Sequence, residues 1–562
     1  MKNEEESSFE ENHALVRTPN SNVLVDPKLT NLSFVQALKE VVTLTVPYTA
    51  ASFILMVGNF VGVVFIGKLG PQALAASNLT SSIQNCFTTT AGTTLTAGSI
   101  LAGRKIGADD SAEVGAILHK SWLFSLLLSM PCVAFMVASK PILLLLGQEP
   151  EVVALAQEYF YGYSWGLPAM FLLSCNRKIA LATKNANVAL CFIVLYQGLD
   201  TLLSYGLIFG EFYLPELGIA GLGYSNSITA WATFLLFSLY MCVAKRFKPY
   251  HLGHFSCKNF YSDLWQFAKI GLPLGAKVAV ELFGGITASF MIGSMGSKQQ
   301  AAQEATQQYI AVLSTPLFGI MDTVSTLVSR AVGTGNYRNA KKLGYTGIGL
   351  GVSIATLGLG LFLAIPNLLL GAFIDNSDSE IMSIGRNLLW INGLGQIADS
   401  VRNIAAGGLS GFLDIMIPTI IIIVFLLFIY IPLSFVMGFP LNLSAVGVMS
   451  ARDITIGLGA ILLFSRWAMV DKKTATPAKS NEAKIEEIRN EDDTDSDVES
   501  AAVPVIGSNN AELPDKQDPL VRKQNKTSYD WWPFHFKPHA SAQLNRQPVL
   551  ASYSTMPATK GM

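Results

Sequence analysis

The segment FIGKLGPQALAAS (residues 65–77) has a counterpart further along the chain, MIGSMGSKQQAAQ (residues 291–303). Each segment ends an apolar run in a Gly-x-x-Gly turn and begins a new run that carries a pair of alanines. Helical hairpins that turn on glycine explain one or two matches, but seven matches in one register, 226 residues apart, indicate a duplicated unit. The matched pairs are Pro47 with Pro273, Gly67 with Gly293, Gly70 with Gly296, Ala75 with Ala301, Ala76 with Ala302, Arg104 with Arg330 and Gly107 with Gly333.

The composition around this duplication is that of a membrane protein. Of 562 residues, 51% are hydrophobic and 14% are charged, whereas a soluble globular domain carries about 25% charged residues. Between residues 34 and 470 the apolar runs reach about 20 residues, the length at which a helix crosses a ~30 Å hydrocarbon core. These runs are too long and too continuously apolar for the strands of a barrel, the other structure that can span a bilayer. The sequence therefore predicts an all-α membrane protein.

Several other classes of protein are disfavoured. A net charge of −1 gives no indication of a nucleic acid partner, and the first residues, MKNEEESSFEEN, contain no apolar stretch, so we expect no cleaved signal peptide. The six cysteines form no C-x-x-C pair and are expected to pack in the interior rather than to form disulfides or bind zinc. Without a Walker loop or a nucleophile–base arrangement, we expect neither an enzyme nor a cofactor.

Twelve apolar segments are candidate membrane spans. In the loops that follow even-numbered spans we count sixteen Lys and Arg, Lys178 and Arg402 among them, against three after odd-numbered spans. Because cytoplasmic loops carry the excess of basic residues, both termini are predicted to face the cytosol, in a plasma membrane or a bacterial inner membrane. The spans are predicted near residues 40–67, 73–102, 117–139, 155–175, 187–210, 217–244, 264–293, 300–331, 343–370, 383–408, 415–438 and 441–468.

Six spans in each copy of the duplicated unit mean that the copies run in the same direction through the membrane. Such parallel repeats form two lobes around a central cavity, the usual architecture of an alternating-access transporter. We therefore predict a cytosolic arm (residues 1–35), an N-lobe (36–250), a C-lobe (251–470) and a disordered cytosolic tail (471–562). The aromatic stretch YDWWPFHF (529–536) in the tail is either a docking motif for a cytosolic partner or a non-specific contact with the membrane surface.

Four acidic residues fall inside predicted spans, where an ionised side chain at the bilayer centre costs about 2.5–3.5 kcal/mol on the insertion scale. Few basic residues are expected at the same depth, so these acids favour a path for a cation or a proton and a cationic cargo. The alternative is that each acid only hydrogen-bonds to a neighbouring helix or caps a broken one. The four are Asp200 in the fifth span, Glu281 in the seventh, Asp322 in the eighth and Asp399 in the tenth.

Several motifs, in their order along residues 36–470, resemble the multidrug and toxic compound extrusion (MATE) family. They are GKLG and ALAAS followed by AGRKIGA, the partner copy GSMG followed by SRAVGTG, LPELGIAGLGYSNSITA, and ADSVRNIAAGGLSGFLDIMIP. The resemblance implies a twelve-helix antiporter that expels organic, often cationic, amphiphiles in exchange for Na⁺ or H⁺. Its superfamily also includes flippases of lipid-linked oligosaccharides, so that the substrate class is less firmly implied than the fold.

The resemblance also implies site residues. Glu281 and Asp399 match acids that the family uses for cation coupling in its C-terminal lobe. Many bacterial members carry an aspartate in the first span, where this chain has Gly62, so an N-lobe site is in doubt. Asp200 matches a polar position of that site, and Ser204 and Asn226 complete it. We therefore expect ion coupling mainly in the C-lobe, with Asp322 as a further candidate and no metal beyond Na⁺.

Three classes of function follow from these features. The favoured one is a cation-coupled exporter of small amphiphilic cations, acting as a monomer in the lipid bilayer. The second is a flippase of related fold, which would need a more basic cavity to hold a diphosphate. The third is a channel or membrane receptor, for which two equivalent lobes with acids in both would have no evident use.

Overall fold

The computed structural model describes residues 32–252, 260–373 and 378–470, and all of them belong to one compact unit. Every regular element within these ranges is helical, which confirms the all-α fold class. The predicted tail, its aromatic stretch and most of the predicted N-terminal arm lie outside the described residues.

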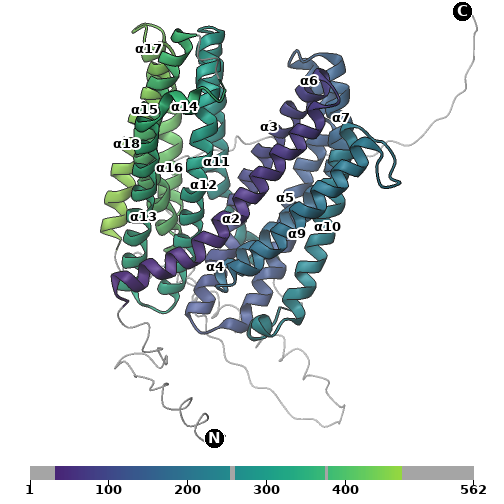
Figure 1. Cartoon of the computed structure of the whole chain (residues 1–562). Helices are drawn as coiled ribbons and strands as arrows, with labels where there is room; N and C mark the ends of the chain where they lie inside the picture. The colour runs from purple at the N-terminus through teal and green to yellow at the C-terminus, as the bar shows by residue number, and fades with distance from the viewer. Residues whose placement is uncertain (1–31, 253–259, 374–377, 471–562) are drawn as a thin grey trace, which may run out of the picture. The chain divides into compact units, whose positions relative to one another are not determined.

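The helices follow one another with short connections (Figure 1). The N-lobe contains α2 (Phe34–Gly67), α3 (Pro71–Thr94), α4 (Thr96–Gly107), η2 (Ser111–Glu113), α5 (Val114–Val137), α6 (Ser139–Leu145), α7 (Pro150–Ser164), α8 (Leu167–Ala182), α9 (Ala186–Phe209), α10 (Ile219–Val243) and η3 (Lys245–Tyr250). The C-lobe contains α11 (Phe260–Gly293), α12 (Ser297–Gly333), α13 (Tyr337–Ala364), α14 (Pro366–Leu370), α15 (Ser379–Gly411), α16 (Met416–Val424), η4 (Phe425–Tyr430), α17 (Ile431–Gly438) and α18 (Ser444–Met469).

Nine helical segments of the described chain are long and apolar enough to cross a membrane by themselves. The other three expected spans are α3 with α4, α7 with α8, and α15. The first two are pairs of helices interrupted at Leu95 and at Trp165–Gly166, and α15 carries buried charged residues. Neighbouring helices cover α15 along most of its length, so its side chains meet protein rather than lipid and need not be apolar.

The duplication is visible in the ends of the helices. α2 and α11 are both 34 residues long, and their first and last residues are 226 positions apart. α3 and α12 also begin 226 positions apart, at Pro71 and Ser297. The ends of α4 and α12, at Gly107 and Gly333, have the same separation. The copies differ where α12 runs without interruption while its counterpart is broken at Leu95, and where α15 is continuous while its counterpart is divided into α7 and α8.

The two copies cross where α4 meets the end of α12. A Cβ on Gly107 would overlap the backbone carbonyl of Arg330, and a Cβ on Gly333 would overlap the carbonyl of Arg104. Arg104 and Arg330 are themselves matched residues of the duplication, so each copy makes the same contact with the other. A reciprocal contact of this kind marks a local two-fold axis. Both glycines are needed because no side chain fits between the backbones.

The first helix of each copy contacts both lobes. The first half of α2, with Ala37 and Val41, packs in a core cluster of C-lobe residues, whereas Ala51 and Ile66 pack in the N-lobe core. In Figure 1, α2 correspondingly runs obliquely from one group of helices to the other. In the same way, α11 belongs to the C-lobe, but Phe267 in its first half packs in the N-lobe core. The predicted boundaries therefore divide the chain into two lobes, but α2 and α11 each pack against both lobes.

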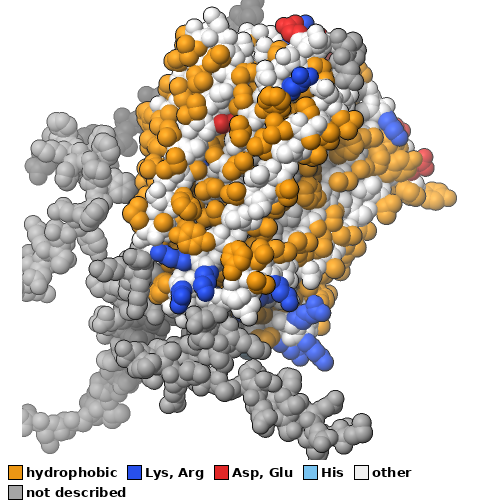
Figure 2. Space-filling model, turned by 60° about the vertical axis from the view of Figure 1, so that its left-hand side comes forward, with side chains coloured by type: hydrophobic (Ala, Val, Ile, Leu, Met, Phe, Trp, Pro, Cys, Tyr) orange, Lys and Arg blue, Asp and Glu red, His pale blue; other side chains and the backbone are white. Residues whose placement is uncertain are grey.

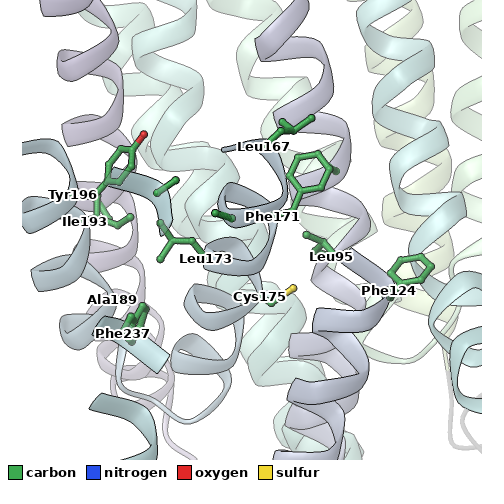
Figure 3. Packing of buried hydrophobic residues seen from close by; sticks show 14 of the residues in the cluster. Leu95, Phe124, Leu167, Phe171, Leu173, Cys175, Ala189, Ile193, Tyr196 and Phe237 are labelled. Atoms are coloured by element: carbon green, nitrogen blue, oxygen red, sulfur yellow. The ribbon is translucent and has the colours of Figure 1, made fainter. Parts of the chain in front are cut away.

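The N-lobe core and the described surface are both rich in apolar side chains, as expected of a protein that lies in lipid. Leu95, Phe171 and Cys175 converge from α8 and the α3–α4 break, buried among aliphatic and aromatic neighbours (Figure 3). Figure 2 shows one face of the molecule, with apolar side chains over its middle and Lys and Arg gathered toward its lower end. Large apolar side chains such as Leu145 and Phe290 are mostly exposed on the described surface, as expected where hydrocarbon replaces water.

Candidate functional site

Asp322 lies at the contact between the lobes rather than inside one of them. Its carboxylate Oδ2 is 2.7 Å from Lys178 Nζ of α8 and accepts a hydrogen bond from the Tyr48 hydroxyl of α2 at 2.9 Å. The Thr96 hydroxyl, at the start of α4, is 3.4 Å from Oδ1 and accepts from Lys178 at 2.9 Å. All four side chains are buried. We call these residues the inter-lobe cluster.

The duplication explains why Thr96 and Asp322 meet. They are 226 residues apart, so each occupies the same position in its own copy. Matched positions approach one another only near the local two-fold axis. The inter-lobe cluster therefore lies on the axis along which the two lobes are joined.

Glu281 and Asp399 are brought together, as predicted, but through a basic residue. Arg402 Nη1 is 2.9 Å from Glu281 Oε1, an ion pair without hydrogen-bond alignment, and Arg402 Nη2 donates to Asp399 Oδ1 at 2.7 Å. Asn403 Nδ2 donates to the same Asp399 oxygen at 3.0 Å. Lys277 Nζ donates to Asn403 Oδ1, also at 3.0 Å. We call these five residues the C-lobe network.

The expectation of few basic partners at this depth is wrong. Lys178, Lys277 and Arg402 are all buried inside helices, and Lys178 and Arg402 are not loop residues as the charge count assumed. Each buried acid of the two clusters has a basic partner because an unpaired buried charge is far more costly. Part of the signal was present in the sequence, since Arg402 follows Asp399 by one helical turn.

Asp200 has different surroundings. Ser225 Oγ of α10 donates to Asp200 Oδ1 at 3.0 Å, and the Ser204 and Ser225 hydroxyls are 2.5 Å apart. Asn226 lies beside them but accepts from the Tyr196 hydroxyl at 3.1 Å instead of contacting Asp200. The structure thus joins Asp200 to Ser204 through Ser225, which the sequence analysis missed although it precedes the predicted Asn226.

No lysine, arginine or histidine forms an ion pair with Asp200 within the described ranges, and its side chain is 7% exposed. Gly62, where the resemblance places an acid in many relatives, is buried against α10. A Cβ at Gly62 would lie 3.3 Å from Leu222 Cδ1, so the space beside this position is occupied by an apolar side chain. Asp200 is therefore the carboxylate on which any N-lobe cation site depends.

A cavity lies between the lobes, as the repeat predicted. Its empty volume is about 450 Å³, including the space at its mouth. Asp322 and Lys277 line it, whereas Asp200, Glu281 and Asp399 do not. The other lining residues are Thr93, Thr96, Leu274, Met321, Ser325, Ala406, Gly407, Ser410, Ile415, Pro418 and Thr419.

This arrangement can be compared with known proteins. A family model described as MatE matches residues 47–206 and 273–436. The two matches begin at Pro47 and Pro273, 226 residues apart, in the register of the duplication.

The chain belongs to the MatE family.

Relatives of this MATE-family chain include two that are named as probable multidrug resistance proteins NorM. The one from Synechocystis sp. is 27% identical over 451 residues, covering 79% of this chain and 97% of the relative. The one from Pseudomonas aeruginosa is 26% identical over 453 residues, covering 79% of this chain and 92% of the relative.

Solved structures share the fold. An outward-facing multidrug resistance MATE family transporter of the MOP superfamily has a TM-score of 0.70 at 18% identity, covering 78% of this chain and 98% of that one. The eukaryotic MATE transporter AtDTX14 has a TM-score of 0.71 at 17% identity, covering 80% and 99%. This MATE-family chain is therefore a multi-pass membrane protein with the fold of a transporter family.

Proposed function

We propose that this chain exports small amphiphilic molecules in exchange for Na⁺ or H⁺ by alternating access of the cavity between its lobes. The observation that carries the proposal is the buried Asp200 carboxylate, which accepts a hydrogen bond from the Ser225 hydroxyl and has no ion-pair partner within the described ranges, in a chain whose relatives are named as probable multidrug resistance proteins. A monovalent cation or a proton bound there offsets the cost of burying an unpaired charge, which is several kcal/mol.

The charge balance favours Asp200 over the C-lobe network as the coupling site. Glu281 and Asp399 already share Arg402, and Asp322 is paired with Lys178, so none of these acids depends on an added cation. The resemblance predicts coupling at Glu281 and Asp399 instead, and the experiment below tests this prediction.

The orientation is part of the same proposal. Without Lys178 and Arg402 the basic residues still lie overwhelmingly after even-numbered spans, which supports cytosolic termini. The coupling ion then enters from outside the cell, and the cargo leaves the cytosol.

The test uses purified protein in proteoliposomes with rhodamine 123 as cargo. A Na⁺ or H⁺ gradient is imposed separately, and dye accumulation is measured for wild type, Asp200→Asn and Glu281→Gln. Asp109→Asn, at an exposed loop position, is the matched control. We expect one gradient to drive accumulation in wild type and the control, and Asp200→Asn to lose about 5-fold or more, since coupling free energies are typically 1–3 kcal/mol.

The outcomes separate the alternatives. If Glu281→Gln abolishes driven accumulation while Asp200→Asn does not, coupling lies in the C-lobe network. If neither gradient drives accumulation of the dye, the exporter proposal is wrong. Dye flux that ignores both gradients is the result expected of a channel, and movement of a lipid-linked sugar in place of the dye is expected of a flippase.

A further inference from the structure

The cavity between the lobes is lined by a lysine that the proposed coupling does not use. Lys277 of α11 is 5% exposed, and its Nζ donates one hydrogen bond, to the neutral amide of Asn403 at 3.0 Å. Lys277 forms no ion pair with any residue that the structure describes. An ammonium group has three donors, so the protein satisfies only a part of its hydrogen-bonding capacity.

The carboxylates nearest to Lys277 point elsewhere. Glu281 is one helical turn further along α11, and Asp399 is on the facing helix α15, yet both contact Arg402 and neither lines the cavity. A molecule in the cavity therefore meets the Lys277 ammonium group and not the carboxylates of Glu281 and Asp399.

The acid that lines the cavity is already neutralised. Asp322 lines the cavity, but its two oxygens contact Lys178, Tyr48 and Thr96 of the inter-lobe cluster. The charged lining residues are Lys277 and Asp322, and because Asp322 is paired with Lys178, Lys277 is the charged lining residue without an ion-pair partner among the described residues. The remaining lining is made of hydroxyl-bearing and apolar side chains.

We propose that this cavity receives amphiphiles that carry an anionic group, a carboxylate in the simplest case, and that Lys277 binds that group. The inference rests on the proposed function, because it takes the cavity to be on the route of the cargo. An anion completes the hydrogen bonding of the buried ammonium, and charge-assisted hydrogen bonds are the strong ones. The cargo class thus differs from the purely cationic one expected from the acids in the sequence.

The test compares two dyes that differ at one group. Rhodamine 110 is the free carboxylic acid whose methyl ester is rhodamine 123, and both share the same cationic ring system. Equilibrium binding to the full chain in lipid nanodiscs is measured by fluorescence polarisation. The variants are Lys277→Gln, which removes the charge, Lys277→Arg, which keeps it, and Lys140→Gln, at an exposed lysine, as the matched control.

We expect wild type to prefer rhodamine 110 by about tenfold, the contribution of one hydrogen bond to a charged group. Lys277→Gln should bind the two dyes equally, whereas Lys277→Arg and Lys140→Gln should retain the preference. The inference is overturned if wild type shows no preference for the acid, or if Lys277→Gln keeps it. Binding of rhodamine 123 by Lys277→Gln with wild-type affinity excludes misfolding as the cause of its lost preference.

Gradient-driven transport of the same dyes in proteoliposomes tests the proposed function separately. If wild type transports the dyes while the binding preference does not depend on Lys277, the cargo class is wrong and the exporter stands. If a gradient moves neither dye, the proposed function fails, and the binding measurement still decides whether Lys277 recognises the anion.

Discussion

Breaking the ion pair between Lys178 and Asp322 should destabilise the protein strongly. The pair joins α8 of the N-lobe to α12 of the C-lobe, and its side chains are only 6% and 12% exposed. The substitution Asp322→Asn removes one charge and leaves the Lys178 ammonium buried. The hydrogen bond from the Tyr48 hydroxyl to this position can persist, because an amide oxygen also accepts.

The expected cost follows from this burial. Removing one partner of a buried ion pair lowers the free energy of unfolding by about 3–5 kcal/mol, whereas replacing both partners by apolar residues of similar size is often neutral. We therefore expect Asp322→Asn and Lys178→Met each to cost about 3 kcal/mol. The double variant Asp322→Leu with Lys178→Met should cost much less than the sum, with a coupling energy above about 2 kcal/mol.

The measurement is equilibrium unfolding in mixed detergent–SDS micelles for wild type, both single variants and the double variant. An exposed ion pair supplies the control. Lys105 is 3.0 Å from Asp110, but each side chain is 40% exposed, so Asp110→Asn should cost less than about 1 kcal/mol. If the buried variants cost no more than this control, or if their costs simply add, the inter-lobe ion pair does not hold the lobes together.

Three further predictions concern packing and topology. Gly107→Val should lower the free energy of unfolding by at least about 1–3 kcal/mol, because its side chain would meet a backbone carbonyl of α12. Gly92→Val is the control, since a side chain at Gly92 meets open space. Equal free energies of unfolding for the two variants would refute the close crossing of the helices. Gln157→Leu should lower the free energy of unfolding by about 1–3 kcal/mol in the same assay, because the buried Gln157 amide hydrogen-bonds to the Ser139 hydroxyl and to two backbone groups at the break between α5 and α6. An unchanged unfolding midpoint would show that water replaces the amide. In a background without native cysteines, a cysteine at Ser379 should label from outside and one at Ser111 only after permeabilisation, and labelling of both from one side would contradict the twelve-span topology.

The sequence by itself determined the architecture. Hydropathy and the 226-residue register located the spans, the two lobes and the acids within them, and α2 and α11 start and end in that register. These properties are readable because a span is a continuous run of about 20 apolar residues and a duplication preserves spacing along one chain. Of the three spans that fail the length and hydropathy test, two are pairs of interrupted helices, and the third, α15, carries buried charged residues.

Only the tertiary structure decided what the buried charges do. Tyr48 and Lys178 are 274 and 144 residues from Asp322, and no spacing rule connects them. Hydropathy assigns the basic side chain of Arg402 to water, yet the structure places it between Glu281 and Asp399. The free energy of a buried charge depends on partners a few ångströms away in space, and helix packing, not chain order, supplies them. For the same reason the sequence could place Asp200 in the membrane but only the structure could show that, within the described ranges, no basic side chain pairs with it.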